Sequence, residues 1–217
     1  MSLKTFILNL LFPIECLNCK IEGFWLCEKC YRALKFTDKK YILKIPFLDG
    51  LFIAGDYDDK IIAELIKKLK FNFIDNLAPI LGRFLSSFWS GIIFSRPDLS
   101  DYKKILLIPL PLSKKRKKWR GFNQAEIIAR AFNADYDYEI NNDLKKTKNK
   151  KPQSSLNEAE RAKNIKNCFT FEGENIKDKT IILIDDVVTT GSTLNEAARI
   201  LKEAGAIKIY GLVVAKG

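Results

Sequence analysis

The chain has 217 residues, with 37 lysines and arginines against 26 aspartates and glutamates, a formal net charge of +11, and no histidine. The absence of histidine excludes a Ser-His-Asp or Cys-His catalytic site, a histidine-ligated metal and an imidazole proton shuttle built from this chain alone. A hydrophobic fraction of 47% allows a sizeable core, and the length suits one domain, with or without a small additional module.

Four of the five cysteines lie within fifteen residues near the N-terminus. They form two Cys-x-x-Cys pairs separated by seven residues, namely Cys16, Cys19, Cys27 and Cys30. Each pair turns the backbone so that two thiolates meet one metal, and two pairs complete a tetrahedral four-sulfur site with no open position. The cluster therefore predicts a structural zinc site in a reducing compartment. A rubredoxin-like iron site is the alternative metal, and disulfide or redox pairs are the alternative chemistry.

The segment before the first cysteine is apolar but short. It runs into Pro13 without a small-residue cleavage site, so it favours a short helix that packs Phe6, Leu10 and Leu11 onto the body over an export signal. No apolar run reaches the roughly 18–20 residues that span a bilayer. We therefore expect a cytoplasmic protein without a transmembrane segment.

Beyond about residue 50, short apolar runs alternate with amphipathic helices. Apolar spacing predicts helices within 61–69, 77–88 and 124–132, and a strand over 105–112 that ends in an irregular turn. The near-continuous apolar run Thr180–Asp185 is typical of a strand that is buried on both faces of a parallel sheet.

A helix over 194–204, capped by Gly205, and a final strand over 207–215 follow this apolar run. Strand, helix and strand in so few residues predict a right-handed βαβ unit, and hence an α/β fold with a doubly wound parallel sheet.

Two adjacent acids, Asp185 and Asp186, stand at the end of the predicted buried strand, where ligands bind in open α/β sheets. A turn opens the next helix and exposes backbone N–H groups and hydroxyls to an anion. It consists of Thr189, Thr190, Gly191, Ser192 and Thr193. Carboxylates beside such a cradle suit a sugar phosphate. Thr193 with Glu196 also matches a capping box, which would explain Thr193 but not the paired acids.

The excess positive charge is concentrated between residues 103 and 151, which hold 14 basic and 5 acidic side chains. Two runs, 114–120 and 145–151, carry most of it, and we expect both to be loops because each follows an apolar segment. Their candidate binding residues are Lys114, Lys115, Arg116, Lys117, Lys118, Trp119, Arg120, Lys145 and Lys146. The alternatives are a solvated lysine-rich surface and a site for pyrophosphate or a nucleic-acid backbone. Trp119 favours nucleic acid because it can stack on a base.

Residues 181–193 resemble the phosphoribosyl-pyrophosphate (PRPP) motif of type I phosphoribosyltransferases, and the chain from about residue 10 onward resembles the ComF family of competence proteins. No P-loop and no G-x-G-x-x-G motif competes with this assignment. The pieces that carry the resemblance, besides the cysteines and the PRPP motif, are residues 108–112, the run Arg120-Gly121-Phe122-Asn123-Gln124-Ala125, Thr147, Gln153, Leu156, Arg161 and Asn164.

The resemblance implies a zinc-ribbon-like module over residues 1–45 and a phosphoribosyltransferase-like domain over 46–217. It implies that Asp185 and Asp186 bind the ribose hydroxyls and that residues 189–193 bind the 5′-phosphate. The turn that contains Pro111 and Leu112 would be the pyrophosphate loop.

The resemblance also implies that residues 145–156 form a flexible loop that closes over the site. Mg²⁺ would be held by pyrophosphate and ribose oxygens and by water. Lys145 and Lys146 stand where the family often has arginine, so they lack a bidentate fork. Cys168 is expected in the core.

Two kinds of function are consistent with these features. One is PRPP-dependent ribosyl transfer to an unidentified acceptor. The other is a role in DNA uptake, in which the PRPP fold is a scaffold or sensor, the basic loops hold single-stranded DNA, and other DNA-uptake proteins are partners.

Overall fold

The computed structural model describes residues 13–96, 99, 101–147, 167–174 and 176–217. Their centre is a five-stranded sheet in which every pairing is parallel, in the order β1-β7-β6-β2-β3. The strands are β1 (Gly50–Asp56), β2 (Ile105–Pro109), β3 (Glu139–Ile140), β6 (Thr180–Val188) and β7 (Lys208–Lys216). A separate antiparallel pair joins β4 (Leu144–Lys146) to β5 (Phe169–Phe171). The predicted α/β fold with a parallel sheet is confirmed.

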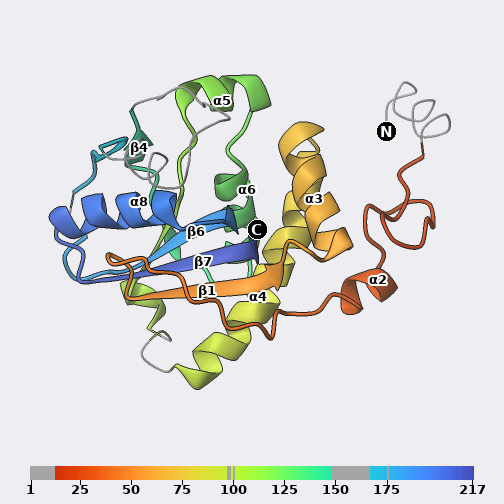
Figure 1. Ribbon diagram of the computed structural model, residues 1–217, viewed down its shortest axis with the longest axis horizontal. Helices are drawn as coiled ribbons and strands as arrows, with labels where there is room; N and C mark the ends of the chain where they lie inside the picture. The colour runs from red at the N-terminus through yellow and green to blue at the C-terminus, as the bar shows by residue number, and fades with distance from the viewer. Residues whose placement is uncertain (1–12, 97–98, 100, 148–166, 175) are drawn as a thin grey trace.

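Helices cover both faces of this sheet (Figure 1). α3 (Lys60–Phe71), α4 (Ala78–Ser95) and α6 (Gln124–Asn133) contribute to the core on one face, and α8 (Ser192–Glu203) to the core on the other. The shorter helices are α2 (Glu28–Arg32), α5 (Lys114–Arg120), η1 (Asp75–Leu77) and η3 (Tyr102–Lys104).

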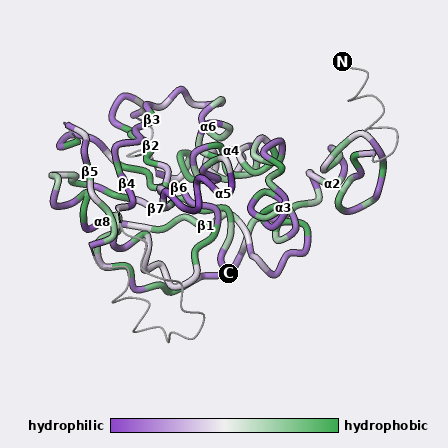
Figure 2. The backbone as a smooth tube through the Cα atoms, turned by 90° about the horizontal axis from the view of Figure 1, so that it is seen from above, coloured by the Kyte–Doolittle hydropathy of each residue, from purple (hydrophilic) through white to green (hydrophobic). Residues whose placement is uncertain are grey.

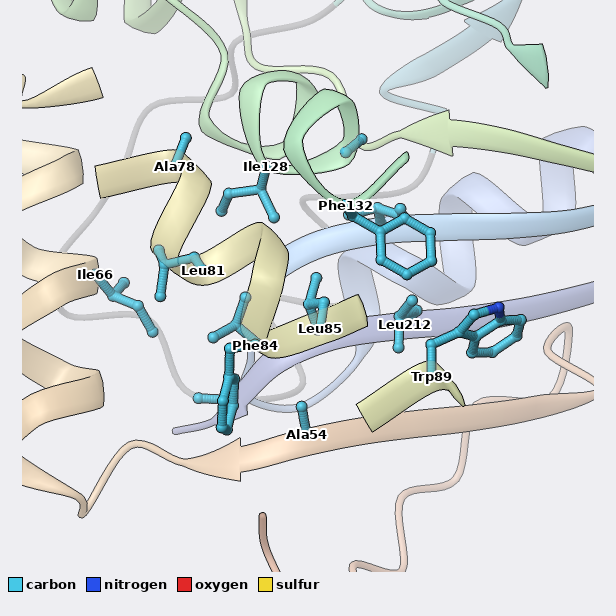
Figure 3. Close-up of a cluster of buried hydrophobic side chains, with 14 of the residues drawn as sticks. Ala54, Ile66, Ala78, Leu81, Phe84, Leu85, Trp89, Ile128, Phe132 and Leu212 are labelled. Carbon is cyan, nitrogen blue, oxygen red and sulfur yellow. The ribbon is translucent and has the colours of Figure 1, made fainter. Parts of the chain in front are cut away.

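The apolar sequence of β6 follows from its burial between these two helical layers. Alternate residues of a strand point to opposite faces, so Ile182 and Ile184 join the α4 side while Ile181 and Leu183 join the α8 side. Figure 3 shows the α4 side, where side chains of α4 meet Phe132 from α6 and Leu212 from β7.

The cysteine segment lies beyond α3 at one end of the molecule in both views (Figures 1 and 2). Its helix α2 is attached to α4 by Glu28, whose carboxylate accepts hydrogen bonds from Arg83 at 2.7 and 3.0 Å. The Arg83 guanidinium also lies 4.0 Å from the centre of the Tyr31 ring. Buried Cys16 and Leu26 belong to the same hydrophobic cluster as the α4 side chains. Packing thus extends across the predicted domain boundary at residue 45, which itself stays a prediction.

The helical stretch Asp75–Ser95 qualifies the expectation about membranes. Among the described residues it is the one helix that length and composition alone would allow to cross a bilayer, with a mean hydropathy of 1.4. Its apolar face, including Leu81, Phe84 and Trp89, is buried in the core of the fold, which accounts for this hydropathy.

Some predicted elements differ clearly from those in the structure. The helix predicted over 77–88 continues to Ser95, and the strand predicted over 105–112 ends at Pro109. The basic run 114–120 was expected to be a loop, and this was wrong because it is helix α5. The predicted N-terminal helix and residues 148–156 of the predicted closing loop lie outside the described residues, as do Gln153, Leu156, Arg161 and Asn164.

Candidate functional site

The acidic pair lies at a step in the edge of the sheet. β2 ends at Pro109, which pairs with Ile184, whereas β6 continues beside β7 as far as Val188. The backbone N–H of Leu110 donates to the carbonyl of Ile184 at 2.9 Å, which holds the chain against β6 just after β2 ends. Asp185 and Asp186 therefore lie inside the strand, not at its last residue as predicted. They still lie beyond the end of the neighbouring strand, in the position where α/β sheets bind ligands.

Asp186 is ion-paired with a residue that the sequence did not single out. Its side chain is almost fully buried on the α3 side of the sheet, and Lys70 Nζ at the end of α3 lies 2.9 Å from its Oδ2. Lys70 shares its helix with other surface lysines, so nothing in the local sequence distinguishes it. Only the packing of α3 against the sheet brings this ammonium group to the acidic pair.

Asp185 is held where its ionised form is disfavoured. Burial raises the pKa of Asp185 well above its usual range, and the neighbouring charge of Asp186 raises it further. Lys70 and a 2.8 Å hydrogen bond from the backbone N–H of Asp186 act in the opposite direction without cancelling the effect. Because two adjacent carboxylates share this site, it favours a ligand or cation that compensates their charge.

The turn after β6, where a phosphate cradle was predicted, leads into the start of α8. Gly191 is the N-cap residue, with φ +78°, a backbone conformation that favours glycine. A Cβ atom on Gly191 would also lie 2.3 Å from Cδ1 of Ile45, which comes from the segment before β1. The hydroxyls of Thr190 and Ser192 are 2.8 Å apart at the opening of the helix. Glycine at position 191 thus permits both the left-handed backbone of the turn and its close packing against Ile45.

The predicted capping box at Thr193 and Glu196 is wrong. α8 begins at Ser192, and its N-cap residue, Gly191, has no side chain to cap the helix. The Thr190 hydroxyl accepts a hydrogen bond from the backbone N–H of Ser192 at 3.4 Å. Glu196 instead forms an ion pair with Arg199 at 2.7 Å and accepts a hydrogen bond from the backbone N–H of Asn167. The backbone N–H groups at this helix end could bind an anion.

Capping residues define both ends of helix α5. The Ser113 hydroxyl accepts a hydrogen bond from Arg116 N at 3.4 Å, and Gly121 closes the helix in the left-handed conformation at φ +86°. Pro111 and Leu112 lie half-buried in the turn that precedes it. Asn123 supports this turn by donating from Nδ2 to the carbonyl of Leu110 at 3.1 Å.

The helix orients its basic residues in different directions. Arg120 is buried and donates to the side chain of Gln124. Burial lowers the pKa of Arg120, while the nearby charges of Asp186 and Asp185 raise it, so this guanidinium is close to the acidic pair. Its Nε is buried without a hydrogen-bond partner in the part of the chain that is described.

The other side chains of α5 are exposed, namely those of Lys114, Lys115, Arg116, Lys117, Lys118 and Trp119. Lys117 pairs with Glu126 at 3.6 Å. Trp119 contacts Phe73 edge to face. In the basic run 114–120, Arg120 is therefore buried while the other six side chains are exposed.

The two predicted lysines of β4 have different environments. Lys145 is exposed and donates back to the carbonyl of Asn142 at 2.7 Å. The Nζ atom of Lys146 lies 5.1 Å from the centre of the Phe169 ring. Burial lowers the pKa of Lys146, and the charge of Asp185 acts weakly in the opposite direction. Cys168 is buried as expected.

The four N-terminal cysteines form a separate candidate metal centre. Their sulfur atoms all lie within 4.8 Å of one another. Burial of Cys16 is outweighed by hydrogen bonds, chiefly from the backbone of Cys27, so its pKa falls to about 6. Asn18 lowers the pKa of Cys30, but burial and hydrogen bonds with the other thiols raise it to about 11. This arrangement could hold a metal ion through four sulfurs.

Comparison with known proteins assigns the larger part of the site to one domain type. Residues 119–217, which include β6, the cradle and the acidic pair, match the phosphoribosyl transferase domain. This part of the chain is phosphoribosyltransferase-like. The match begins within α5, so Lys70 and the cysteine cluster lie outside it.

The whole chain is also similar to proteins named for competence or DNA utilization. It is 28% identical to competence protein F of Haemophilus influenzae over 91% of this chain and 89% of that protein. It is 36% identical to competence protein ComFC of Bacillus subtilis over 69% of this chain and 56% of that protein. It is 27% identical to DNA utilization protein YhgH of Escherichia coli K12 over 91% of this chain and 94% of that protein. The predicted phosphoribosyltransferase-like fold and resemblance to the ComF family are therefore confirmed.

The raised pKa of Asp185 predicts a pH-dependent stability. The protonated carboxyl is favoured in the folded protein. Its contribution to the free energy of unfolding is therefore fully present below the ordinary aspartate pKa of about 4, and is lost as pH rises towards the pKa of Asp185 in the folded protein. Asn cannot ionise, so Asp185→Asn avoids this loss, and its stability relative to wild type should increase by at least about 1 kcal/mol between pH 5 and pH 8. Urea unfolding without phosphate or divalent cations measures this. The exposed Asp178, changed to Asn, is the control, and a stability difference that does not vary with pH would contradict the assignment.

Proposed function

We propose that this protein binds PRPP with Mg²⁺ at the carboxyl ends of β2 and β6, and that it acts in DNA uptake during natural transformation. The observation that carries the ligand is the juxtaposition of three features: an acidic pair with Asp186 buried and Asp185 half-buried, a helix N-terminus that follows it in the chain, and cationic side chains from α3, α5 and β4. Together these features offer acceptors for hydroxyl groups beside two kinds of anion site.

The acidic pair and the cradle fit the ribose 5-phosphate half of this ligand. Asp185 and Asp186 accept hydrogen bonds from the 2′- and 3′-hydroxyls. The backbone N–H groups and hydroxyls of residues 189–193 bind the 5′-phosphate, favoured by the positive end of the α8 dipole. Lys70 must share or release Asp186 when the ribose binds, because its Nζ already lies against that carboxylate.

The pyrophosphate half fits the basic side of the site. The turn with Pro111 and Leu112 approaches it from β2, and Arg116, Arg120 and Lys146 supply positive charge. The unpartnered Nε of Arg120 is a buried donor that an anion could satisfy. Mg²⁺, bound through ligand oxygens and water, would neutralise part of the pyrophosphate charge and assist its departure.

A second candidate is an active phosphoribosyltransferase that is unrelated to DNA. In that reaction an acceptor nucleophile bonds to C1 of the ribose as the bond from C1 to the pyrophosphate oxygen breaks, and pyrophosphate leaves with both electrons. The intact acidic pair supports this candidate, although no base-binding pocket identifies the acceptor among the described residues. Pyrophosphate release with a panel of bases and amines distinguishes turnover from binding alone.

The role in DNA uptake is supported by the named relatives and by the outer face of α5. Three relatives are called competence or DNA utilization proteins. The exposed Lys114, Lys115 and Lys118 lie on the outer side of the short helix, separate from the inward Arg120. These lysines are free to contact a nucleic-acid backbone while Arg120 serves the ligand site.

Zinc is our assignment for the four-cysteine cluster, with a structural role in a cytoplasmic protein. Protein purified without added metal should contain one equivalent of zinc, because four thiolates in tetrahedral reach of one another bind this ion tightly. Elemental analysis checks this, and Cys168→Ser is the control because Cys168 lies far along the chain from the cluster. Less than about half an equivalent of zinc would contradict the assignment, and iron in its place would identify a rubredoxin-like site.

PRPP binding is tested by calorimetry in the presence of Mg²⁺. We expect wild-type protein to bind, and Asp185→Asn/Asp186→Asn to weaken binding at least about tenfold, because the amides remove the negative charge of the pair and replace carboxyl oxygens that accept from the ribose hydroxyls. Asp178→Asn, an exposed change before the same strand, should bind like wild type. Failure of the wild type to bind PRPP would eliminate the ligand.

DNA binding is tested with a labelled single-stranded oligonucleotide over a range of salt concentrations. Affinity should fall as the salt concentration rises, and Lys115→Glu/Lys118→Glu should weaken binding at least about tenfold. In this variant the slope of log affinity against log salt concentration should decrease by the amount that corresponds to about one to two phosphate contacts. Lys35→Glu/Lys40→Glu makes the same change in net charge at exposed positions before β1 and should have a smaller effect. An affinity that is independent of salt, or equal effects of the two pairs, would contradict the assignment of this surface.

A further inference from the structure

Two aromatic side chains that lie far apart in the sequence meet on the surface beside the site. Phe73 follows α3, and Trp119 belongs to α5. Their ring centres are 5.0 Å apart and their planes are inclined by 83°, an edge-to-face contact. Trp119 is nevertheless 58% exposed and Phe73 40% exposed. The pair therefore has a fixed geometry and leaves aromatic surface open to solvent.

The backbone at Phe73 is strained. Its φ angle is +58°, in the left-handed region that a bulky side chain rarely occupies. Helices often end in this conformation, but with glycine or asparagine at the position. Asn72 is the immediate neighbour of Phe73 and yet has φ −97°. The chain thus places an aromatic ring where another residue would fit at lower cost, and such strain is typical of functional positions.

Phe73 and Trp119 have neighbours of two kinds among the basic residues: exposed lysines of α5, and the cations Arg120 and Lys70 near the acidic pair. Residues four apart share a helix face, so Lys115 adjoins Trp119 on the exposed side of α5, and Lys118 is its neighbour in sequence. Arg120, next to Trp119, is buried near the acidic pair. At the other ring, Lys70 precedes Phe73 by three residues and binds Asp186. Both rings are therefore close in the chain to residues of the ligand site.

We propose that the Phe73–Trp119 pair is a stacking platform for a base of single-stranded DNA whose phosphates contact the exposed lysines of α5. This inference rests on the proposed role in DNA uptake and adds the residues that hold the strand. An aromatic face surrounded by lysines suits a ligand that combines flat bases with a polyanionic backbone. A single strand is required, because a duplex covers the faces of its bases.

The test compares two strands that carry the same charge. One is a labelled fifteen-nucleotide oligothymidylate, and the other is an abasic strand with the same number of phosphates. Wild type should bind the first more tightly. Trp119→Leu should weaken binding to the first strand by about 5- to 150-fold and leave the abasic strand and the salt dependence unchanged. Trp119→Phe should retain most of the affinity because it keeps an aromatic face.

Two matched variants separate stacking from a structural role. Phe94→Leu alters an aromatic residue near the end of α4 that is 92% exposed, and should bind both strands like wild type. Phe73→Asn relieves the backbone strain, so it should melt no lower than wild type yet bind oligothymidylate more weakly. A lower melting temperature with unchanged affinity would show that Phe73 is only structural and would overturn the platform.

The outcomes also separate this inference from the proposed function. If wild type binds neither strand, the DNA role fails and the platform fails with it. If wild type binds both strands equally, and Trp119→Leu changes nothing, the platform is overturned while the DNA role stands. An equal loss of affinity for both strands in Trp119→Leu would mean that the ring contacts the backbone, which also contradicts stacking.

Discussion

The site depends on the electrostatic balance around two adjacent carboxylates, of which Asp186 is almost fully buried and Asp185 half-buried. Water screens Asp186 poorly at the step of the sheet, and the protein places cations from several elements near the pair. α3 supplies Lys70 and α5 supplies Arg120, and each element must hold its position for the pair to be tolerated. The site is thus arranged around the balance between these carboxylates and the cations near them.

The sequence predicted what local patterns determine. The apolar run of β6, the cysteine spacing and the turn at Gly191 each depend on consecutive residues, and each is present in the structure. Lys70 was missed because its role comes from the packing of α3 onto the sheet, and its helix shows only an ordinary lysine-rich face. The contact between Phe73 and Trp119 could not be predicted for the same reason, since it joins segments that are separated by β2.

The basic run 114–120 shows how a compositional signal can hide a local one. Its position after an apolar segment suggested a loop, yet lysine and arginine are good helix formers, and a serine and a glycine lie at the two ends of the run. A helix places its side chains on fixed faces, whereas a loop does not impose such a pattern. Arg120 can then serve a buried site while Lys115 and Lys118 remain at the surface.

The ion pair between Glu28 and Arg83, together with the packing around it, has a thermodynamic consequence for the cysteine cluster. Cys16 and Leu26 share a hydrophobic core with α4, and α4 packs against α6, whose first turn holds Arg120 through Gln124. Free energy released when a metal binds the cysteines is therefore linked to the folding of the body, rather than confined to the first 45 residues. If the cysteines hold a metal, removing it would lower the population of the folded phosphoribosyltransferase-like domain, and not only that of the first 45 residues.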